Sequence, residues 1–265
     1  MNCFFHFKHK LHSLFEPQTM ASTKKRTIIS AMVSADKKLE KELLEAGNKL
    51  LNPPSSVDNL LRLLGQVGKS LSKVEQSPSK SIQKALSPSL KALISDKLIK
   101  HSDVGVKVAL ASCLSELTRI TAPDGPYNDH QMKEVLRLIV SSFENLHDMS
   151  SRWYETRISI LETVAKVRLC VVMLDLECDA LILEMFRLFL KTIREYHPEI
   201  VFSSMEAIMA RVIEESDDIS LGLLYPILDC VKKDNKVVSP IARKLGKSVL
   251  QKCATKLIIP ICGML

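Results

Sequence analysis

Two short triplets in the sequence resemble the end of a phosphate-binding loop, in which backbone amides and a lysine hold a phosphate group. They are Gly68-Lys69-Ser70 and Gly246-Lys247-Ser248. The glycine that such a loop requires five residues earlier is replaced by Leu63 in one case and by Ile241 in the other. Neither triplet follows a predicted strand, so the sequence predicts no nucleotide site.

Metal and catalytic chemistry have equally little support. Cys3, His6, His9 and His12 are spaced to lie along one face of a helix, a pattern that can bind zinc. The alternative is that this leader is a variable extension of little structural weight, and no metal site is assigned. The sequence motifs of serine hydrolases, zinc proteases and dinucleotide-binding enzymes do not occur. We therefore expect a protein that is not an enzyme and has no cofactor and no small-molecule substrate.

Ser77 is a candidate for proline-directed phosphorylation. It is followed by Pro78 and, three positions on, by Lys80, an order of residues that suits such kinases. The same serine could instead cap a helix that has Pro78 in its first turn. Both interpretations are kept.

Positive charge is concentrated in the first part of the chain. Residues 1–100 contain 17 Lys and Arg against 8 Asp and Glu, a net charge of +9, whereas residues 101–265 have a net charge of −2. Any electrostatic attraction to nucleic acid or an acidic partner should therefore lie in the first hundred residues. The alternative is a solvated basic leader on a neutral domain. No aromatic side chain that could stack on a base occurs in residues 16–126, so any DNA contact should be nonspecific and auxiliary. The candidate contact residues are Lys24, Lys25, Arg26, Lys80 and Lys84.

A stiff turn is the strongest candidate for a binding site. Residues 122–127 read Ala-Pro-Asp-Gly-Pro-Tyr and so combine two prolines with one carboxylate and one aromatic ring. As structure alone, this segment is a stop signal that ends a helix. A turn that holds Asp124 and Tyr127 in a fixed geometry would also bind a partner peptide at a low entropic cost.

The elements that position these residues are predicted to be helices. The chain is 46% hydrophobic and has only 8 glycines and 5% aromatic residues, which argues against a turn-rich β fold. From residue 37 onward apolar residues recur at helical spacing, and the breaks fall at Pro, Gly, Asn or Ser-Pro. The predicted helices span residues 37–51, 57–73, 79–100, 103–121, 129–148, 152–173, 177–197, 199–215, 218–233 and 239–256.

The cysteines and the hydropathy indicate the compartment. The seven cysteines are an odd number without a C-x-x-C pair, and most lie in apolar helical stretches. This usage predicts free thiols in a reducing, intracellular compartment. No apolar run approaches the roughly 18–20 residues that cross a bilayer, so no membrane contact is expected.

Four of the predicted helices repeat one pattern. Aligned on Lys107, Arg157, Phe202 and Arg243, they carry the same class of residue at offsets of three, seven and ten, which form one face of a helix. The anchors are 50, 45 and 41 residues apart, near the roughly 40–47 of HEAT and armadillo units. The aligned positions are Leu110, Ile160, Met205 and Gly246, then Leu114, Val164, Met209 and Leu250, then Leu117, Val167, Val212 and Cys253.

Each repeating helix is preceded by another amphipathic helix, so the unit is a helix pair. Because a pair cannot bury both of its apolar faces alone, the pairs must stack. The sequence therefore predicts an all-α, HEAT/armadillo-like α-solenoid over residues 35–259. Residues 1–34 are predicted to be a basic, disordered extension, and residues 260–265 a short tail. An extended solenoid surface favours binding of polypeptides over chemistry in a deep pocket.

The stretch Leu117–Tyr127, LTRITAPDGPY, and the preceding DVGVKVALASCL resemble the N-terminal part of the Pds-five family, the cohesin-associated sister chromatid cohesion regulators. The similarity looks plant-like and runs from about Ala35 to Ile259. It implies a nuclear, HEAT-repeat scaffold that contacts the cohesin complex and acts in mitosis, meiosis and DNA repair. In the family this turn belongs to a surface that engages short peptides of cohesin regulators. The resemblance thus implicates Ala122, Pro123, Asp124, Pro126 and Tyr127, with Gly125 in place of a more usual alanine.

Three functions remain open on the sequence. The first is a non-enzymatic cohesin-associated scaffold that binds regulator peptides. The second is a nonspecific nucleic-acid-binding protein that acts through its basic first hundred residues. The third is an unrelated HEAT-repeat adaptor, which shares the predicted fold and differs only in its partners.

Overall fold

The computed structural model describes residues 36–217, 219, 221–232 and 235–257. Within these ranges the regular structure is helical and no strand occurs, which confirms the predicted fold class. A first helix spans residues 36–51. The helices that follow are α2 (Val57–Leu71), α3 (Lys80–Leu93), α4 (Asp96–Ile99), α5 (Val104–Thr121), α6 (Asp129–Ser141), α7 (Tyr154–Lys166), α8 (Leu169–Asp175), α9 (Asp179–Thr192), α10 (Glu199–Glu215), α11 (Leu221–Val231) and α12 (Pro240–Lys252).

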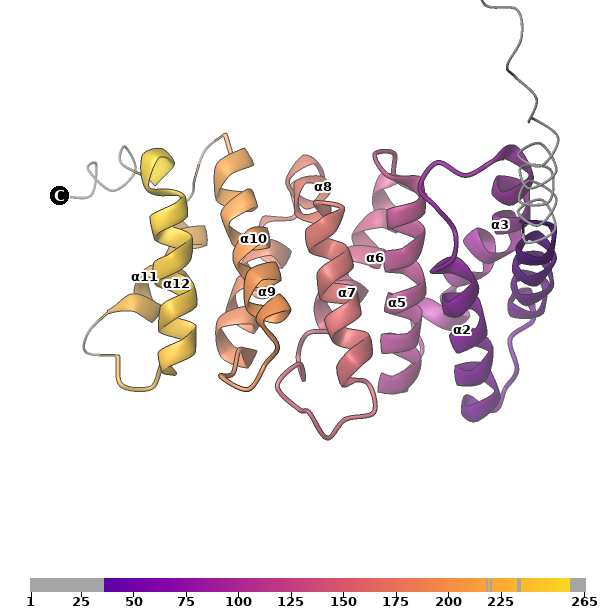
Figure 1. The fold of residues 1–265 in the computed structure, drawn as a ribbon, viewed down its shortest axis with the longest axis horizontal. Helices are drawn as coiled ribbons and strands as arrows, with labels where there is room; N and C mark the ends of the chain where they lie inside the picture. Colours follow the sequence, from indigo (N-terminus) through magenta and orange to yellow (C-terminus); the bar gives the residue numbers. More distant parts are fainter. Residues whose placement is uncertain (1–35, 218, 220, 233–234, 258–265) are drawn as a thin grey trace, which may run out of the picture.

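The helices form two rows that run along the length of the molecule (Figure 1). In one row α2 packs on α5, α5 on α7, α7 on α10, and α10 on α12. In the other row α4 packs on α6, α6 on α9, and α9 on α11. The rows are joined within pairs such as α5 with α6 and α11 with α12. This stack of helix pairs is the predicted solenoid.

The aligned positions of the repeats face the seam that these pairs share. Their helices, α5, α7, α10 and α12, are neighbours in one row. Of the aligned residues only Val167 and Leu250 are partly exposed, and the others are buried in one continuous core. At roughly 1.5–3 kcal/mol for each large side chain, this burial makes every pair dependent on its neighbours.

Gly246 departs from the apolar column because its helix lies close to α11. A Cβ atom added at Gly246 would lie 3.1 Å from Cγ1 of Val231. The missing side chain therefore permits close packing of α12 on α11, and the position still belongs to the seam.

Several predicted helices are shorter than the sequence pattern suggests. The run 79–100 divides into α3 and α4 at Ser95, which is the N-cap of α4, and the run 129–148 is helical only to Ser141. The run 152–173 divides into α7 and α8 at Arg168, whose φ of 55° is left-handed and turns the chain. Since no glycine or proline occurs at that break, periodicity alone did not reveal it.

Two buried charged side chains tie elements of the stack together. Arg157 of α7 donates from Nε to the Ser142 carbonyl at 2.9 Å and from Nη1 to the Ser151 hydroxyl at 3.1 Å, which fastens the turn after α6 to α7. Glu206 of α10 accepts hydrogen bonds from Ser248 and Lys252 of α12. These bonds satisfy groups that would otherwise be costly to bury.

The predicted extension 1–34 and tail 260–265 lie outside the described residues, and their boundaries stay predictions. Among the helices that the structure describes, none is long and apolar enough to span a bilayer.

Candidate peptide-binding groove

The turn between α5 and α6 is fixed at both of its ends. At its start, Gln76 Nε2 donates to the Ala122 carbonyl at 2.7 Å, and the Ala122–Pro123 peptide bond is cis. At its end, the Tyr127 hydroxyl donates to the Leu90 carbonyl of α3 at 3.0 Å. The side chain of Asn128 then caps α6 by accepting from the Gln131 amide. The prolines and these bonds hold residues 123–126 in one conformation.

The C-terminal end of α5 is held by the segment that follows α2. The Arg119 guanidinium donates to the carbonyls of Leu71 and Val74, at 3.2 and 2.8 Å, and pairs with Glu116. The amide of Ser77 donates to the Ile120 carbonyl at 3.1 Å. The last carbonyls of a helix have no partner within it, so this bond satisfies one of them. The turn is therefore built on a braced helix end.

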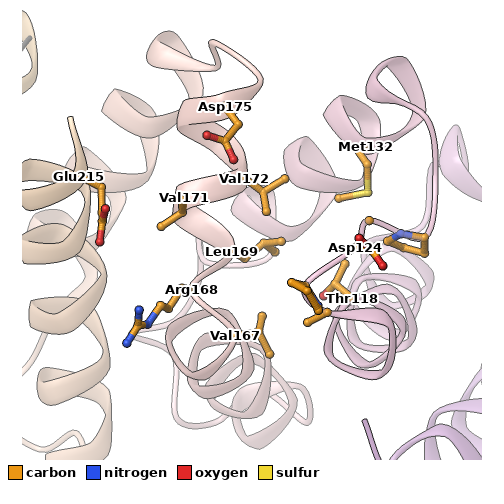
Figure 2. A pocket seen from close by; sticks show the side chains of 14 residues that line it. Thr118, Asp124, Met132, Val167, Arg168, Leu169, Val171, Val172, Asp175 and Glu215 are labelled. Atoms are coloured by element: carbon orange, nitrogen blue, oxygen red, sulfur yellow. The ribbon is translucent and has the colours of Figure 1, made fainter. Parts of the chain in front are cut away.

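A groove of about 390 Å³ separates this turn from α8 (Figure 2). Residues 122–126 form one wall, and the break between α7 and α8 forms the other. Apart from residues 122–126, the lining of the groove includes apolar side chains that are partly or fully buried. These apolar residues are Met132, Val167, Leu169, Val171 and Val172.

Acidic side chains line the edge of the groove. Asp124, Asp175 and Glu215 are exposed, and one cation, Arg168, lies among them. Figure 2 places Asp124 on the side of the turn, with Arg168 and Glu215 on the opposite side. Glu215 pairs with Arg211 at 3.2 Å, whereas Asp124 and Asp175 have no ion pair within the described residues. The arrangement suits an apolar side chain on the floor and a Lys or Arg side chain at the edge.

The structure places four of the five predicted partner-binding residues together. Ala122, Pro123, Asp124 and Pro126 all line the groove, and Gly125 lies with them. Tyr127 is not among the residues that line it. Its hydroxyl donates to the Leu90 carbonyl of α3, and burial raises the pKa of its phenol. The hydroxyl of Tyr127 thus braces the turn, and contact of Tyr127 with a partner stays a prediction.

Sequence reasoning missed the opposite wall of the groove. Arg168, Val171, Val172 and Asp175 belong to a stretch that reads as one uninterrupted helix, and their role depends on the break at Arg168. No residue type in that stretch signals the break. Only the packed structure shows that α8 faces the turn.

The Ser77 site lies in the turn between α2 and α3. Ser77 is exposed and has a φ of 55°. The alternative interpretation of Ser77 as a helix cap is wrong, because Ser79 is the N-cap of α3 and its hydroxyl accepts from the Ile82 amide. Phosphorylation of Ser77 stays a prediction.

The remaining predicted residues are dispersed. Lys80 and Lys84 are exposed near the start of α3, whereas Lys24, Lys25 and Arg26 lie outside the described residues, as do Cys3, His6, His9 and His12. The two triplets that resemble phosphate loops, residues 68–70 and 246–248, are inside α2 and α12. A helical backbone cannot wrap a phosphate as such a loop does.

Comparison with known proteins relates the chain to cohesion proteins. A family model described as "Sister chromatid cohesion protein PDS5 protein" matches residues 58–264. The chain is 62% identical over 226 residues to "Sister chromatid cohesion protein PDS5 homolog C" of Arabidopsis thaliana. The aligned region covers 85% of this chain and 26% of that protein. It is 26% identical over 234 residues to PDS5 homolog A of Homo sapiens, covering 88% of this chain and 17% of that protein.

The fold has a solved counterpart as well. In "Structure of the Pds5-Scc1 complex and implications for cohesin function", the matched chain is 26% identical and superposes with a TM-score of 0.67, over 77% of this chain and 33% of that one. The matched region of this chain spans about a quarter of the length of the Arabidopsis PDS5 homolog C. The match excludes the alternative of an unrelated HEAT-repeat adaptor. The chain belongs to the PDS5 family of sister chromatid cohesion proteins.

Proposed function

We propose that this chain is a non-enzymatic, nuclear scaffold of the cohesin system that regulates sister chromatid cohesion by holding short peptides of cohesin regulators. The groove between the α5–α6 turn and α8 is the proposed binding site. One observation carries the proposal: the turn that the family resemblance singles out lines an apolar groove, and its carboxylate Asp124 has no ionic partner among the residues that the structure describes.

The chemistry of the groove defines the peptide that it would accept. An aliphatic or aromatic side chain would cover Val171 and Val172, and a neighbouring Lys or Arg would pair with Asp124. The braced turn does not need to reorganise on binding, so the entropic cost falls mainly on the peptide.

Peptide arrays test this proposal. Overlapping peptides from cohesin subunits and their regulators are probed with the wild-type chain and with Asp124→Asn. We expect a small set of peptides that contain an apolar residue next to a cation, with affinity lowered about 5- to 20-fold by Asp124→Asn. Glu162→Gln on the exposed face of α7 is the matched control and should leave affinity unchanged. Equal effects of the two variants would count against the groove.

Auxiliary DNA contact is a second proposal, supported by the net charge of +9 in residues 1–100. Lys80 and Lys84 are exposed and make no ion pair within the described residues. Affinity for duplex DNA should fall steeply as salt rises, and charge reversal at Lys24, Lys25, Arg26, Lys80 and Lys84 should abolish it. A flat salt dependence would rule out this contact.

Phosphorylation of Ser77 is proposed as a modification of the same region. Ser77 and its neighbour Gln76 are bonded to the end of α5 and to the turn, so a phosphate there lies next to the brace of the groove. Treatment with a proline-directed kinase followed by mass spectrometry checks the site. Unchanged phosphate incorporation in Ser77→Ala would reject it.

A further inference from the structure

A second groove lies between α9 and α11. Its volume is about 480 Å³, and its walls include Arg187, Lys191 and Arg194 on one side and Tyr225 and Asp229 on the other. It is next to the turns that follow α9 and α11, at the lower edge of the molecule in Figure 1, whereas α8 and the α5–α6 turn are at the upper edge. The two grooves share no residue.

Cationic side chains dominate one wall. Arg187, Lys191 and Arg194 are four and three residues apart, a spacing that places them on one side of α9 and its end. None of them has a carboxylate partner within the described residues. Arg194 donates from Nη1 to the carbonyls of Lys191 and Ile193, both at 2.8 Å, and so keeps its charge beside the helix end. This wall attracts anions.

The groove's own carboxylate is already paired. Asp229 accepts from Lys232 Nζ at 3.0 Å and from Asn235 Nδ2 at 3.1 Å. It is therefore not free to neutralise the cations of α9. Positive charge collects here although residues 101–265 have a net charge of −2.

The opposite wall offers an exposed aromatic ring. Tyr225 is 61% exposed, and Lys232 Nζ lies 5.4 Å from its ring centroid. Partly buried apolar side chains, Leu190 and Val238, lie in the same groove. An exposed tyrosine beside arginines and an apolar surface is the composition of binding hot spots in protein interfaces.

We infer that this groove binds an acidic peptide segment. Its Asp or Glu carboxylates would pair with Arg187, Lys191 and Arg194, and one aromatic or aliphatic side chain would pack on Tyr225. A peptide fits better than a nucleic acid because the cations extend only about 10 Å along the helix and border an apolar surface. The inference is independent of the regulator-peptide site, since it uses different residues.

Fluorescence anisotropy with three labelled 12-residue peptides tests the inference on the full chain. One peptide is rich in Asp and Glu with a central Phe, the second has Ala in place of Phe, and the third has Lys in place of the acids. We expect the first to bind, and Arg187→Glu combined with Lys191→Glu to weaken it at least about tenfold. Tyr225→Ala should weaken it about fivefold, and because this ring is largely exposed the variant should keep its helicity.

A matched control separates this groove from general charge effects. Lys91→Glu combined with Lys97→Glu changes the net charge equally on exposed positions of α3 and α4, and binding should stay within about twofold. An equal loss in this control, or no preference for Phe over Ala, would overturn the inference. Competition by duplex DNA that depends on the same α9 residues would assign the groove to nucleic acid instead. Self-association that Tyr225→Ala removes would assign it to a second copy.

Discussion

Replacement of Tyr127 by Phe separates the brace of the α5–α6 turn from its binding surface. The change removes one hydroxyl, which donates to the Leu90 carbonyl at 3.0 Å, and leaves the ring in place. The hydroxyl does not line the groove. We therefore expect a loss of stability with little loss of peptide affinity.

The expected loss in the free energy of unfolding follows from the lost hydrogen bond and from the burial of the Tyr127 ring. A hydrogen bond of this kind contributes about 0.5–1.5 kcal/mol, and a carbonyl left without a partner raises the loss toward about 3 kcal/mol. For Tyr127→Phe we expect about 1–2 kcal/mol. Tyr127→Ala also removes a partly buried ring and should cost about 2–4 kcal/mol. Asp124→Ala changes an exposed side chain and should stay within about 0.5 kcal/mol.

Two measurements on the same variants check this prediction. Urea unfolding followed by circular dichroism gives the change in stability, and hydrogen exchange locates it, with faster exchange expected in α3 and the start of α6. Peptide affinity should change less than about threefold for Tyr127→Phe and about 5- to 20-fold for Asp124→Ala. If Tyr127→Phe unfolds like wild type but loses affinity as fully as Asp124→Ala, its hydroxyl contacts the partner and the reasoning is refuted.

Three further predictions concern the apolar core between the helix pairs, the ion pair of Glu206 with Lys252, and the thiol of Cys113. Leu114→Ala removes a fully buried side chain and should cost about 3–5 kcal/mol in urea unfolding. Glu206→Gln should lower the free energy of unfolding by about 1–2 kcal/mol at pH 7. Burial raises the pKa of Glu206, but hydrogen bonds from Lys252 and Ser248 lower it overall, so its contribution is complete above the unfolded pKa. The difference from wild type should therefore shrink as the pH falls below the unfolded pKa and disappear below the lower folded pKa. Burial, aided by the charge of Glu116, raises the pKa of the Cys113 thiol to about 12, so alkylation at pH 8 followed by mass spectrometry should leave it unmodified.

Each of these predictions has a control and a contrary result. Leu44 is 43% exposed, so Leu44→Ala should lower the free energy of unfolding by less than about 1 kcal/mol. An equally small loss for Leu114→Ala would contradict the burial of Leu114 in a core that the helix pairs share. Glu214→Gln, on an exposed carboxylate, should cost under about 0.5 kcal/mol, and a pH-independent effect of Glu206→Gln would contradict the ionic tie. Cys178 is partly exposed and should be alkylated faster than Cys113. Equal rates would contradict the burial of Cys113.

The stacking of the helix pairs could be predicted because the seam is a periodic property. Residues such as Leu110, Ile160 and Met205 recur at fixed offsets, and a helix pair has no other way to bury them. The ends of the helices were less predictable, since local polar contacts and caps set them. Ser95 takes the N-cap position of α4 without a side-chain cap hydrogen bond, within a run whose apolar spacing continues unbroken.

The sequence allowed prediction of only one of the two walls of the candidate groove. The prolines and Asp124 mark the turn in the sequence, and the structure places them at a groove. The other wall depends on the left-handed Arg168, a tertiary effect that its residue type does not signal. The bond from Tyr127 to Leu90 joins residues that are 37 positions apart, so the sequence alone did not reveal its bracing role.

The central claim is that peptides bind between the α5–α6 turn and α8. Hydrogen exchange of the full chain with and without a peptide from the array tests it most directly. Binding should slow exchange at Asp124, Gly125 and residues 171–175 and leave residues 187–194 unchanged. Slower exchange elsewhere in the solenoid, with no change at Asp124, Gly125 and α8, would contradict the claim.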